Sequence, residues 1–320
     1  MTPPTGLTFF VEVAAAELDA LLSETTLKLL AQAQASLAVA MIDLLPERAV
    51  ALRRAASYGI GVTAWLVLDR CDGYWLTIDN AESAGRRWQQ VQAWLTHESV
   101  QVQAVGLDIE MPEADAVALS RAPLPSLWRL WTRRRRRHEV ALAKGAYLAL
   151  IEQVRGAGWP VETYQLPFVI DERAARSTLL QRVLGFADVR GDREVLMLYR
   201  SVPPAGLGRW MVELWGAEAE AIAVGITGGG VASLQPVFAN RQLHLQALRD
   251  ELARARHFGR PLYVFSLEGC VQGEMLEELL QQPLPKLPRL GPPAWLWLGR
   301  QLAGALLRLD VVWGRLGRRD

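Results

Sequence analysis

Eight short apolar segments recur along the chain, separated by longer stretches with the spacing of amphipathic helices, such as residues 47–59, 81–97 and 239–259. Strands that alternate with helices form parallel sheets, and eight such units close into a (β/α)8 barrel of typically about 250 residues. The rival fold, an open doubly wound sheet, is disfavoured because no GxGxxG motif follows the first segment. The sequence therefore predicts an α/β fold, a (β/α)8 TIM barrel. The predicted strands are LTFFVEV (7–13), LAVAMID (37–43), GVTAWLVLD (61–69), VQAVGLDIE (102–110), PVETYQLP (160–167), EVLMLYRS (194–201), AIAVGITGG (221–229) and PLYVFSLEG (261–269).

Two regions fall outside this repeat. The connection after the fourth segment is long and contains PSLWRLWTRRRRRHEV (125–140), while the end of the chain is rich first in proline and then in tryptophan, leucine and arginine. We expect a barrel over residues 1–282 and a Pro/Trp/Arg-rich amphipathic helical tail over residues 283–320.

The composition excludes several function classes. With 35 basic and 34 acidic side chains, the net charge of +1 gives no global attraction for nucleic acid. The two cysteines, Cys71 and Cys270, belong to no CxxC or Cys/His cluster, which argues against a structural zinc site. The first 22 residues lack a basic region before an uninterrupted apolar run, so we expect no signal peptide and a cytoplasmic location.

Two carboxylates end the fourth predicted strand. Strand side chains alternate between faces, so Asp108 and Glu110 point the same way, and the bulky Val105, Leu107 and Ile109 point the other way. The bulky side chains suit the helix layer, which leaves the two acids at the mouth of the barrel. Active sites of such barrels lie at this C-terminal end of the strands. Two like charges in one inward column are costly unless they have a task.

Other predicted strands end in polar or aromatic residues as well. On the eighth, we expect Tyr263, Phe265 and Leu267 to face the helices and Ser266 and Glu268 to face inward; Glu12 closes the first strand. Asp43 and Asp69 are also candidates, although a strand-end aspartate often caps the next helix. The remaining candidates for ligand binding at the mouth are Tyr74, Trp75, Tyr164, Gln165, Tyr199 and Arg200.

Scarce residue types narrow the chemistry. No histidine or lysine falls at a predicted strand end, which disfavours a histidine-ligated metal, a Ser-His-Asp triad or a Schiff-base lysine. Paired carboxylates among aromatics suit glycoside hydrolysis, in which one acid protonates the leaving oxygen and a second group stabilises or attacks the sugar cation. We assign Glu110 as the general acid, with its pKa raised by the charge of Asp108, and Glu268 as nucleophile or base. No cofactor and no metal are predicted.

The segment GLDIE (106–110) resembles the end of the DxxDxDxE signature of chitinase-type glycoside hydrolases, and MLY (197–199) is similar to their Met-x-Tyr-Asp segment. The resemblance implies that Glu110 is the proton donor, Asp108 its partner and Tyr199 a ligand of the reacting sugar. Gln103 and Gly106 stand where the signature has its first two aspartates, and Arg200 replaces the final Asp or Asn.

Other readings remain open. The glycines of ITGGGV, Gly228, Gly229 and Gly230, follow the seventh strand, where barrels often bind phosphate, so a phosphosugar isomerase or lyase is an alternative. A non-catalytic sugar-binding or membrane-surface protein is another. The tail could pack on the barrel or lie at a membrane interface, and TRRRRRH (132–138) is a solvated helix start or an anion-binding segment.

Overall fold

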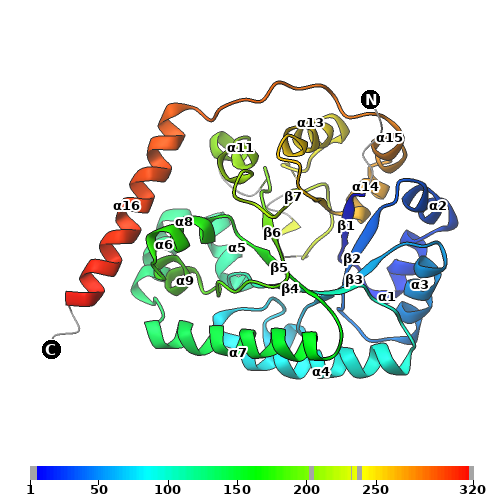
Figure 1. The fold of residues 1–320 in the computed structure, drawn as a ribbon, viewed down its shortest axis with the longest axis horizontal. Coiled ribbons are helices and arrows are strands. Elements are labelled where there is room, and N and C mark those ends of the chain that lie inside the picture. Colours follow the sequence, from blue (N-terminus) through cyan, green and yellow to red (C-terminus); the bar gives the residue numbers. More distant parts are fainter. Residues whose placement is uncertain (1–5, 202–204, 232, 236–239, 317–320) are drawn as a thin grey trace.

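The computed structural model describes residues 6–201, 205–231, 233–235 and 240–316. Its centre is a closed barrel of eight parallel strands in chain order, β1 to β8, with β8 paired back to β1. Figure 1 shows the strands at the middle of the molecule with helices around them. The predicted fold class is therefore confirmed, and each predicted segment overlaps one strand. The strands are β1 (Thr8–Val11), β2 (Ser36–Ala40), β3 (Val62–Leu66), β4 (Ala104–Asp108), β5 (Val161–Gln165), β6 (Arg193–Met197), β7 (Ala221–Gly225) and β8 (Leu262–Phe265).

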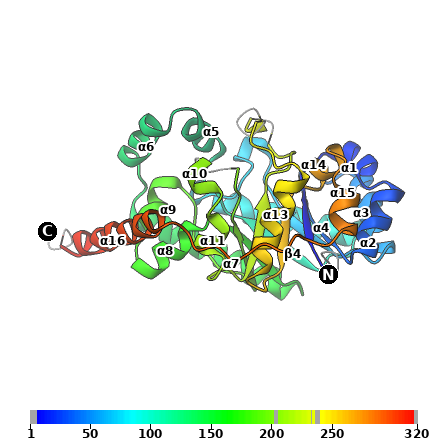
Figure 2. The same cartoon turned by 90° about the horizontal axis from the view of Figure 1, so that it is seen from above.

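Helices surround the barrel and fill the connections between strands (Figures 1 and 2). Their bounds are α1 (Ala15–Leu21), α2 (Glu24–Gln32), α3 (Pro46–Ser57), α4 (Ala81–His97), α5 (Glu113–Arg121), α6 (Pro123–Thr132), α7 (Arg137–Gly156), α8 (Phe168–Ala175), α9 (Leu179–Leu184), α10 (Ala205–Gly208), α11 (Met211–Trp215), α13 (Leu245–Arg256), α14 (Leu267–Gln272), α15 (Leu276–Gln281) and α16 (Ala294–Leu316), with short 3-10 turns η1 (Arg70–Asp72) and η2 (Ile78–Asn80).

Two apolar layers follow from the alternation of side chains along the strands. The outer layer, between strands and helices, is aliphatic and includes Val105, Leu107 and Ile109 of the β4 segment, as predicted from their bulk. The inside of the barrel is filled largely by aromatic rings. The Phe10 ring lies at its centre, with its centroid 4.9 Å from that of Tyr164 and 5.4 Å from that of Trp65.

One glycine makes room for this interior. A Cβ at Gly106 would lie 2.4 Å from the Tyr164 hydroxyl oxygen, a separation that no real side chain could keep. The small residues at the base of β4 are therefore a packing requirement of the ring that fills the barrel.

The orientation predicted for the eighth strand is wrong. Tyr263 and Phe265 face the barrel interior, with centroids 5.7 and 5.9 Å from that of Phe10, rather than the helices. The strand ends at Phe265, and Ser266 caps α14, so Glu268 belongs to a helix and not to the strand. Large side chains do not mark the outer face here because rings fill the inside.

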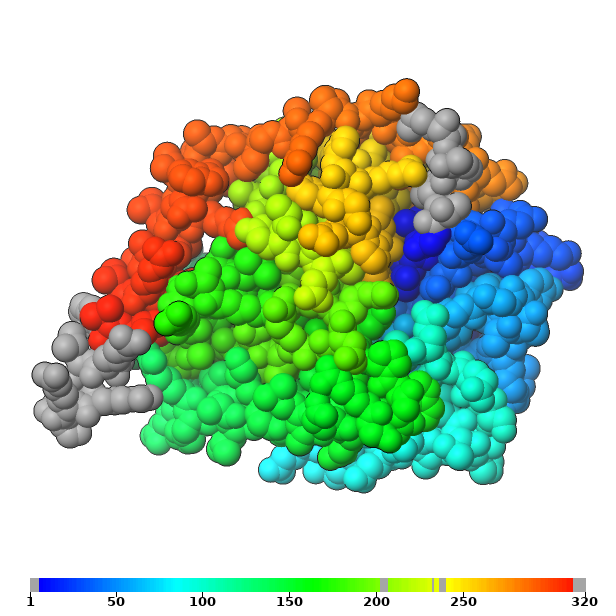
Figure 3. Space-filling view, in the orientation of Figure 1, coloured from blue at the N-terminus to red at the C-terminus, as the bar shows by residue number. Residues whose placement is uncertain are grey.

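Helix α16 lies along the outside of the barrel against α8, at the end of an extended segment that begins after α15 (Figures 1 and 3). Division of the chain at residue 282 stays a prediction, although α15 ends at Gln281, close to that boundary. Across the described ranges, none of the helices is long and apolar enough to cross a membrane.

Candidate active site

Asp108 and Glu110 lie at the mouth of the barrel, where β4 ends. The Asp108 side chain is buried, with 3% of its surface exposed, and Glu110 is half-buried. Backbone bonds hold the segment in place: the Glu110 amide donates to the Leu76 carbonyl at 2.8 Å, and the Leu76 amide donates to the Asp108 carbonyl at 3.3 Å. The pair is therefore fixed on a continuation of the sheet, and Glu110 is the more accessible of the two acids.

Burial sets the proton affinity of this pair. It raises the pKa of Glu110 to about 7, and a hydrogen-bonding interaction with Asp108 opposes that rise. Burial also raises the pKa of Asp108 well above its usual range, and the charges of Glu110 and Glu12 raise it further. The two acids titrate as one interacting pair, in which a charge on one raises the proton affinity of the other. Burial is the largest cause of the raised Glu110 pKa, and the effect expected from the charge of Asp108 stays a prediction.

Glu12 is a third carboxyl group at the mouth, directly after β1. Its Oε1 accepts a 2.6 Å hydrogen bond from the Tyr74 hydroxyl. Burial raises the pKa of Glu12 to about 8, the Tyr74 bond opposes this, and the charges of Glu268 and Glu110 add to it. Glu12 therefore lies close enough to Glu110 and Glu268 for their charges to raise its pKa.

Glu268 approaches the mouth from the first turn of α14 and is almost completely buried. Its Oε1 accepts the backbone N–H of Glu12 at 3.3 Å, and the amide of Gly230 also hydrogen-bonds its carboxylate. Burial raises the pKa of Glu268 to about 7, and these N–H donors oppose the rise. The acids that follow β1, β4 and β8 thus form one cluster, although they are distant in sequence. We call Glu12, Asp108, Glu110 and Glu268 the carboxyl cluster.

The glycines after β7 lie against this cluster. A Cβ on Gly229, whose φ is +72°, would be 2.2 Å from Glu268 Oε1, and one on Gly230 would be 3.6 Å from Glu12 Oε2. A Cβ on Gly228 would be 3.0 Å from the Cα of Gly269 at the start of α14. Glycine is required because the loop closes directly onto a carboxylate. One amide of this loop, that of Gly230, hydrogen-bonds the Glu268 carboxylate, so it is already occupied by an acid of the protein.

Aromatic side chains surround the acids. The Tyr199 ring is half-buried and has its centroid 5.8 Å from that of Phe265. Burial raises the pKa of Tyr199, and the charges of Asp108, Glu110 and Glu12 raise it further, which places this hydroxyl next to the cluster. Trp75 is buried within the same interior group as Tyr74.

Three buried polar atoms of this region have no hydrogen-bond partner within the described part of the chain. They are Asp108 Oδ1, Glu268 Oε2 and Trp65 Nε1. Unpaired buried polar groups cost free energy, and their concentration at one place is typical of a site that binds a polar ligand. Asp108 Oδ1 and Glu268 Oε2 are acceptors, whereas the Trp65 N–H is close enough to Asp108 to lower the pKa of that carboxyl group.

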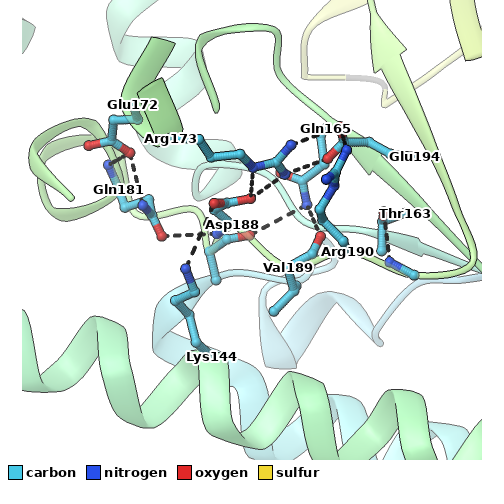
Figure 4. A network of polar contacts seen from close by, with 12 residues as sticks. Lys144, Thr163, Gln165, Glu172, Arg173, Gln181, Asp188, Val189, Arg190 and Glu194 are labelled. Atoms are coloured by element: carbon cyan, nitrogen blue, oxygen red, sulfur yellow. Dashed lines mark hydrogen bonds and ion pairs between the residues drawn. The ribbon is translucent and has the colours of Figure 1, made fainter. Parts of the chain in front are cut away.

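Two predicted ligand-binding residues lie elsewhere. The Tyr164 hydroxyl points away from the mouth, donating to Glu162 Oε2 at 3.2 Å, and its ring fills the barrel. Gln165 lies on the outer side of β5, where its Nε2 donates to the Val189 carbonyl at 3.3 Å within a network that includes Arg173 (Figure 4). Neither side chain joins the carboxyl cluster.

Asp43 joins two helices and not the site. Its Oδ2 accepts the Ala15 amide at 2.9 Å, at the start of α1, and its carboxylate binds Arg48 of α3. Burial alone would raise the pKa of Asp43, but the bonds from Arg48 and from the Ala15 amide outweigh it and lower the pKa. Asp43, three residues after the end of β2, therefore holds the starts of two helices beside that strand.

Three further candidates have structural partners. Asp69 is exposed and pairs with Arg87 at 3.4 Å. Arg200 pairs with Glu251 of α13 at 3.1 Å, on the outside of the barrel. Ser266 caps α14, where its Oγ accepts the Gly269 amide at 3.2 Å and donates to the Gly228 carbonyl at 2.7 Å. Ser266 thereby fixes the position from which Glu268 reaches the cluster.

Three residues near the mouth were not among the predicted site residues: Glu12, Trp65 and Phe265. For Glu12 the sequence contains a signal: it lies two residues after Phe10 at the end of the first predicted strand, so both side chains point to the same face. Among the described residues, no group of three or more histidines, cysteines and acids has the arrangement of a metal site.

Neither a family model nor a curated protein matches this chain. Solved structures match its fold. The glycoside hydrolase domain of PgaB (BpsB) from Bordetella bronchiseptica aligns with a TM-score of 0.51 at 10% identity, over 87% of this chain and 99% of that one. A GH18 chitinase from Pseudoalteromonas aurantia aligns at 0.49 and 8% identity, over 86% and 98% of the two chains. A D-allulose 3-epimerase from Methylomonas sp. aligns at 0.45 and 11% identity, over 83% and 85%. At 10% identity, the likeness to the PgaB domain shows a shared fold and nothing more.

Proposed function

We propose that this chain is a glycoside-hydrolase-like barrel that binds a carbohydrate at its C-terminal mouth and acts on it by acid–base chemistry of carboxyl groups. The observation that carries the proposal is the carboxyl cluster, in which acids from three separate parts of the barrel meet among tyrosines with raised pKa values. The likeness in fold to the PgaB glycoside hydrolase domain is compatible with it.

In this proposal Glu110 is the general acid. Its pKa of about 7 leaves a substantial protonated fraction at neutral pH, and its half-exposed position makes it the acid that a ligand can reach. Protonated Asp108 donates a hydrogen bond to Glu110, which orients it and supports the anion left after proton transfer to the glycosidic oxygen. Asp108 acts as the partner of Glu110 and keeps its own proton.

The second function belongs to the Glu12–Glu268 pair or to the substrate itself. Glu268 is fixed by the amides of Glu12 and Gly230, so its negative charge is held next to the mouth, as stabilisation of a sugar cation requires. The Tyr74 and Tyr199 hydroxyls supply polar contacts for a polyhydroxylated ligand. The Gly228–Gly230 loop adds no anion site in this account, because its neighbours are acids.

A thermal-shift screen of neutral oligosaccharides against phosphorylated sugars tests the ligand class. A ligand at 100 times its Kd stabilises the folded state by about 2.7 kcal/mol, or roughly 4 °C in Tm for a chain of this size. We expect neutral oligosaccharides to give the shift. Stabilisation by phosphorylated sugars alone would contradict the proposal and favour the isomerase or lyase reading.

Turnover of the oligosaccharide identified in that screen tests the mechanism. Glu110→Gln should lower kcat by at least about 100-fold, the usual contribution of a general acid, while the thermal shift with ligand is retained. Glu82→Gln, on an exposed position of α4, is the matched control and should behave as the wild type. Full activity in Glu110→Gln would remove Glu110 from the mechanism.

A further inference from the structure

Two charged residues of helix α16, Arg300 and Asp310, face the rest of the protein. Arg300 faces the barrel, where its Nε donates to Asp171 Oδ1 at 2.7 Å, its Nη2 pairs with Glu218 at 2.8 Å, and its guanidinium lies 5.1 Å from the centroid of the Trp215 ring. Ten residues later, Asp310 also faces inward and binds Arg137 at 3.0 Å and Arg182. These ion pairs fasten both halves of the helix to the protein.

The outer face of the same helix is apolar. Leu302 is 67% exposed and Leu306 64%, and Trp295 and Leu298 are also exposed, one to three turns apart on the side away from the barrel. The inward apolar contacts are limited to residues such as Leu296 and Leu307. In Figure 3 the helix forms an outer edge of the molecule. This is the reverse of a surface helix that packs its apolar stripe on a core and shows charge to water. We call the exposed side chains Trp295, Trp297, Leu298, Leu302, Leu306, Leu309 and Val312 the outer face of α16.

The charge on this face indicates what covers it. Between residues 294 and 312 the chain has three charged side chains, and of these only Arg308 is exposed; the acid, Asp310, is turned inward. The sequence then continues with Arg315, Arg318 and Arg319. Leucines beside tryptophans and arginines are typical of helices that lie in the headgroup region of an anionic bilayer.

We propose that the outer face of α16 binds the surface of an anionic membrane, with the helix parallel to the bilayer plane and the barrel held beside it. The inward ion pairs enforce this orientation, because Arg300 and Asp310 keep one side of the helix on the protein while the apolar side enters the interface. The proposal is independent of the chemistry at the barrel mouth.

Vesicle co-sedimentation of the full-length protein tests it. Phosphatidylcholine vesicles with phosphatidylglycerol should pellet the protein, and vesicles of phosphatidylcholine alone should pellet much less. The triple variant Leu298→Gln, Leu302→Gln, Leu306→Gln should partition about 100-fold more weakly, if each leucine contributes a factor of about five when it enters the interface. Leu142→Gln is the matched control, since Leu142 is 71% exposed on α7.

Folding of each variant is checked by its melting temperature, and Arg308→Glu provides a second test on one exposed side chain. It should weaken binding to the anionic vesicles, with little effect on the small amount bound to neutral ones. Absence of wild-type pelleting, or equal pelleting of the wild type and the triple variant, would overturn the proposal. A wild-type dimer that the triple variant converts to monomer, without vesicle binding, would assign the face to a second copy of the chain.

Discussion

Replacement of Glu12 by glutamine should change how stability depends on pH. In the folded protein the pKa of this carboxyl group is raised by burial from 4.5 to about 8. The native state therefore binds the proton more tightly than the unfolded chain does. The contribution of the Glu12 carboxyl group to the free energy of unfolding therefore falls as the pH rises from about 4.5 to about 8. No further loss occurs above that range.

The magnitude follows from these two pKa values. For one group with values of 4.5 and about 8, the loss between pH 5 and pH 8 is about 3 kcal/mol. Glutamine keeps an oxygen that can accept the Tyr74 hydroxyl, now 2.6 Å from Glu12 Oε1, but carries no charge at either pH. Glu12→Gln should therefore remove most of this loss and stabilise the protein at pH 8 much more than at pH 5.

Thermal unfolding at pH 5 and pH 8 measures the effect. For 320 residues, 1 kcal/mol corresponds to about 1.5 °C in Tm, so the Tm gain at pH 8 should exceed that at pH 5 by roughly 5 °C. Glu47→Gln, at an exposed position of α3, is the control and should leave the pH dependence unchanged. If Glu12→Gln loses stability between pH 5 and pH 8 as steeply as the wild type, the argument that burial controls this carboxyl group is wrong.

Two further substitutions test the surroundings of the cluster. Tyr74→Phe removes the hydrogen-bond donor to Glu12 and should destabilise the protein by about 2 kcal/mol above pH 8, where the carboxylate is charged, and by less at pH 5. Urea denaturation at both pH values measures the two losses, and equal losses would contradict this prediction. Gly229→Ala should cost about 1–3 kcal/mol because it combines a φ of +72° with a Cβ 2.2 Å from Glu268 Oε1. Gly59→Ala, with a φ of +75° and no atom within 4 Å of the added Cβ, should cost about 1 kcal/mol, and equal losses at the two glycines would refute the packing argument.

The barrel could be predicted because eight apolar segments recur with helical stretches between them. It could also be predicted which side chains of β4 face the barrel interior and which face the helices. Bulky and small residues alternate along this strand, and only the side with small residues leaves space for the Tyr164 ring. The same test failed on β8, because the barrel interior accepts large aromatic rings such as Phe265. Side-chain size therefore predicts which face of a strand points inward only where small residues line the barrel interior.

The functional candidates depended on partners that sequence spacing does not reveal. Asp43 closely follows β2, where a candidate acid is expected, but Arg48 and the Ala15 amide occupy its oxygens. Glu268 was expected at the mouth from a strand and reaches it from α14 instead, held by the Glu12 amide. Arg48 is only five residues from Asp43, but the Ala15 amide is 28 residues from Asp43 and the Glu12 amide is 256 residues from Glu268. Only the folded structure brings these last two pairs together.

The central claim is that the mouth of the barrel, at Glu110, is where a sugar binds and reacts. The most direct measurement is a crystal structure of the Glu110→Gln variant with the oligosaccharide that gives the largest thermal shift. The account predicts a glycosidic oxygen within hydrogen-bond distance of residue 110 and a sugar ring beside Tyr199. A sugar bound at another place, with the mouth holding only solvent, would contradict it.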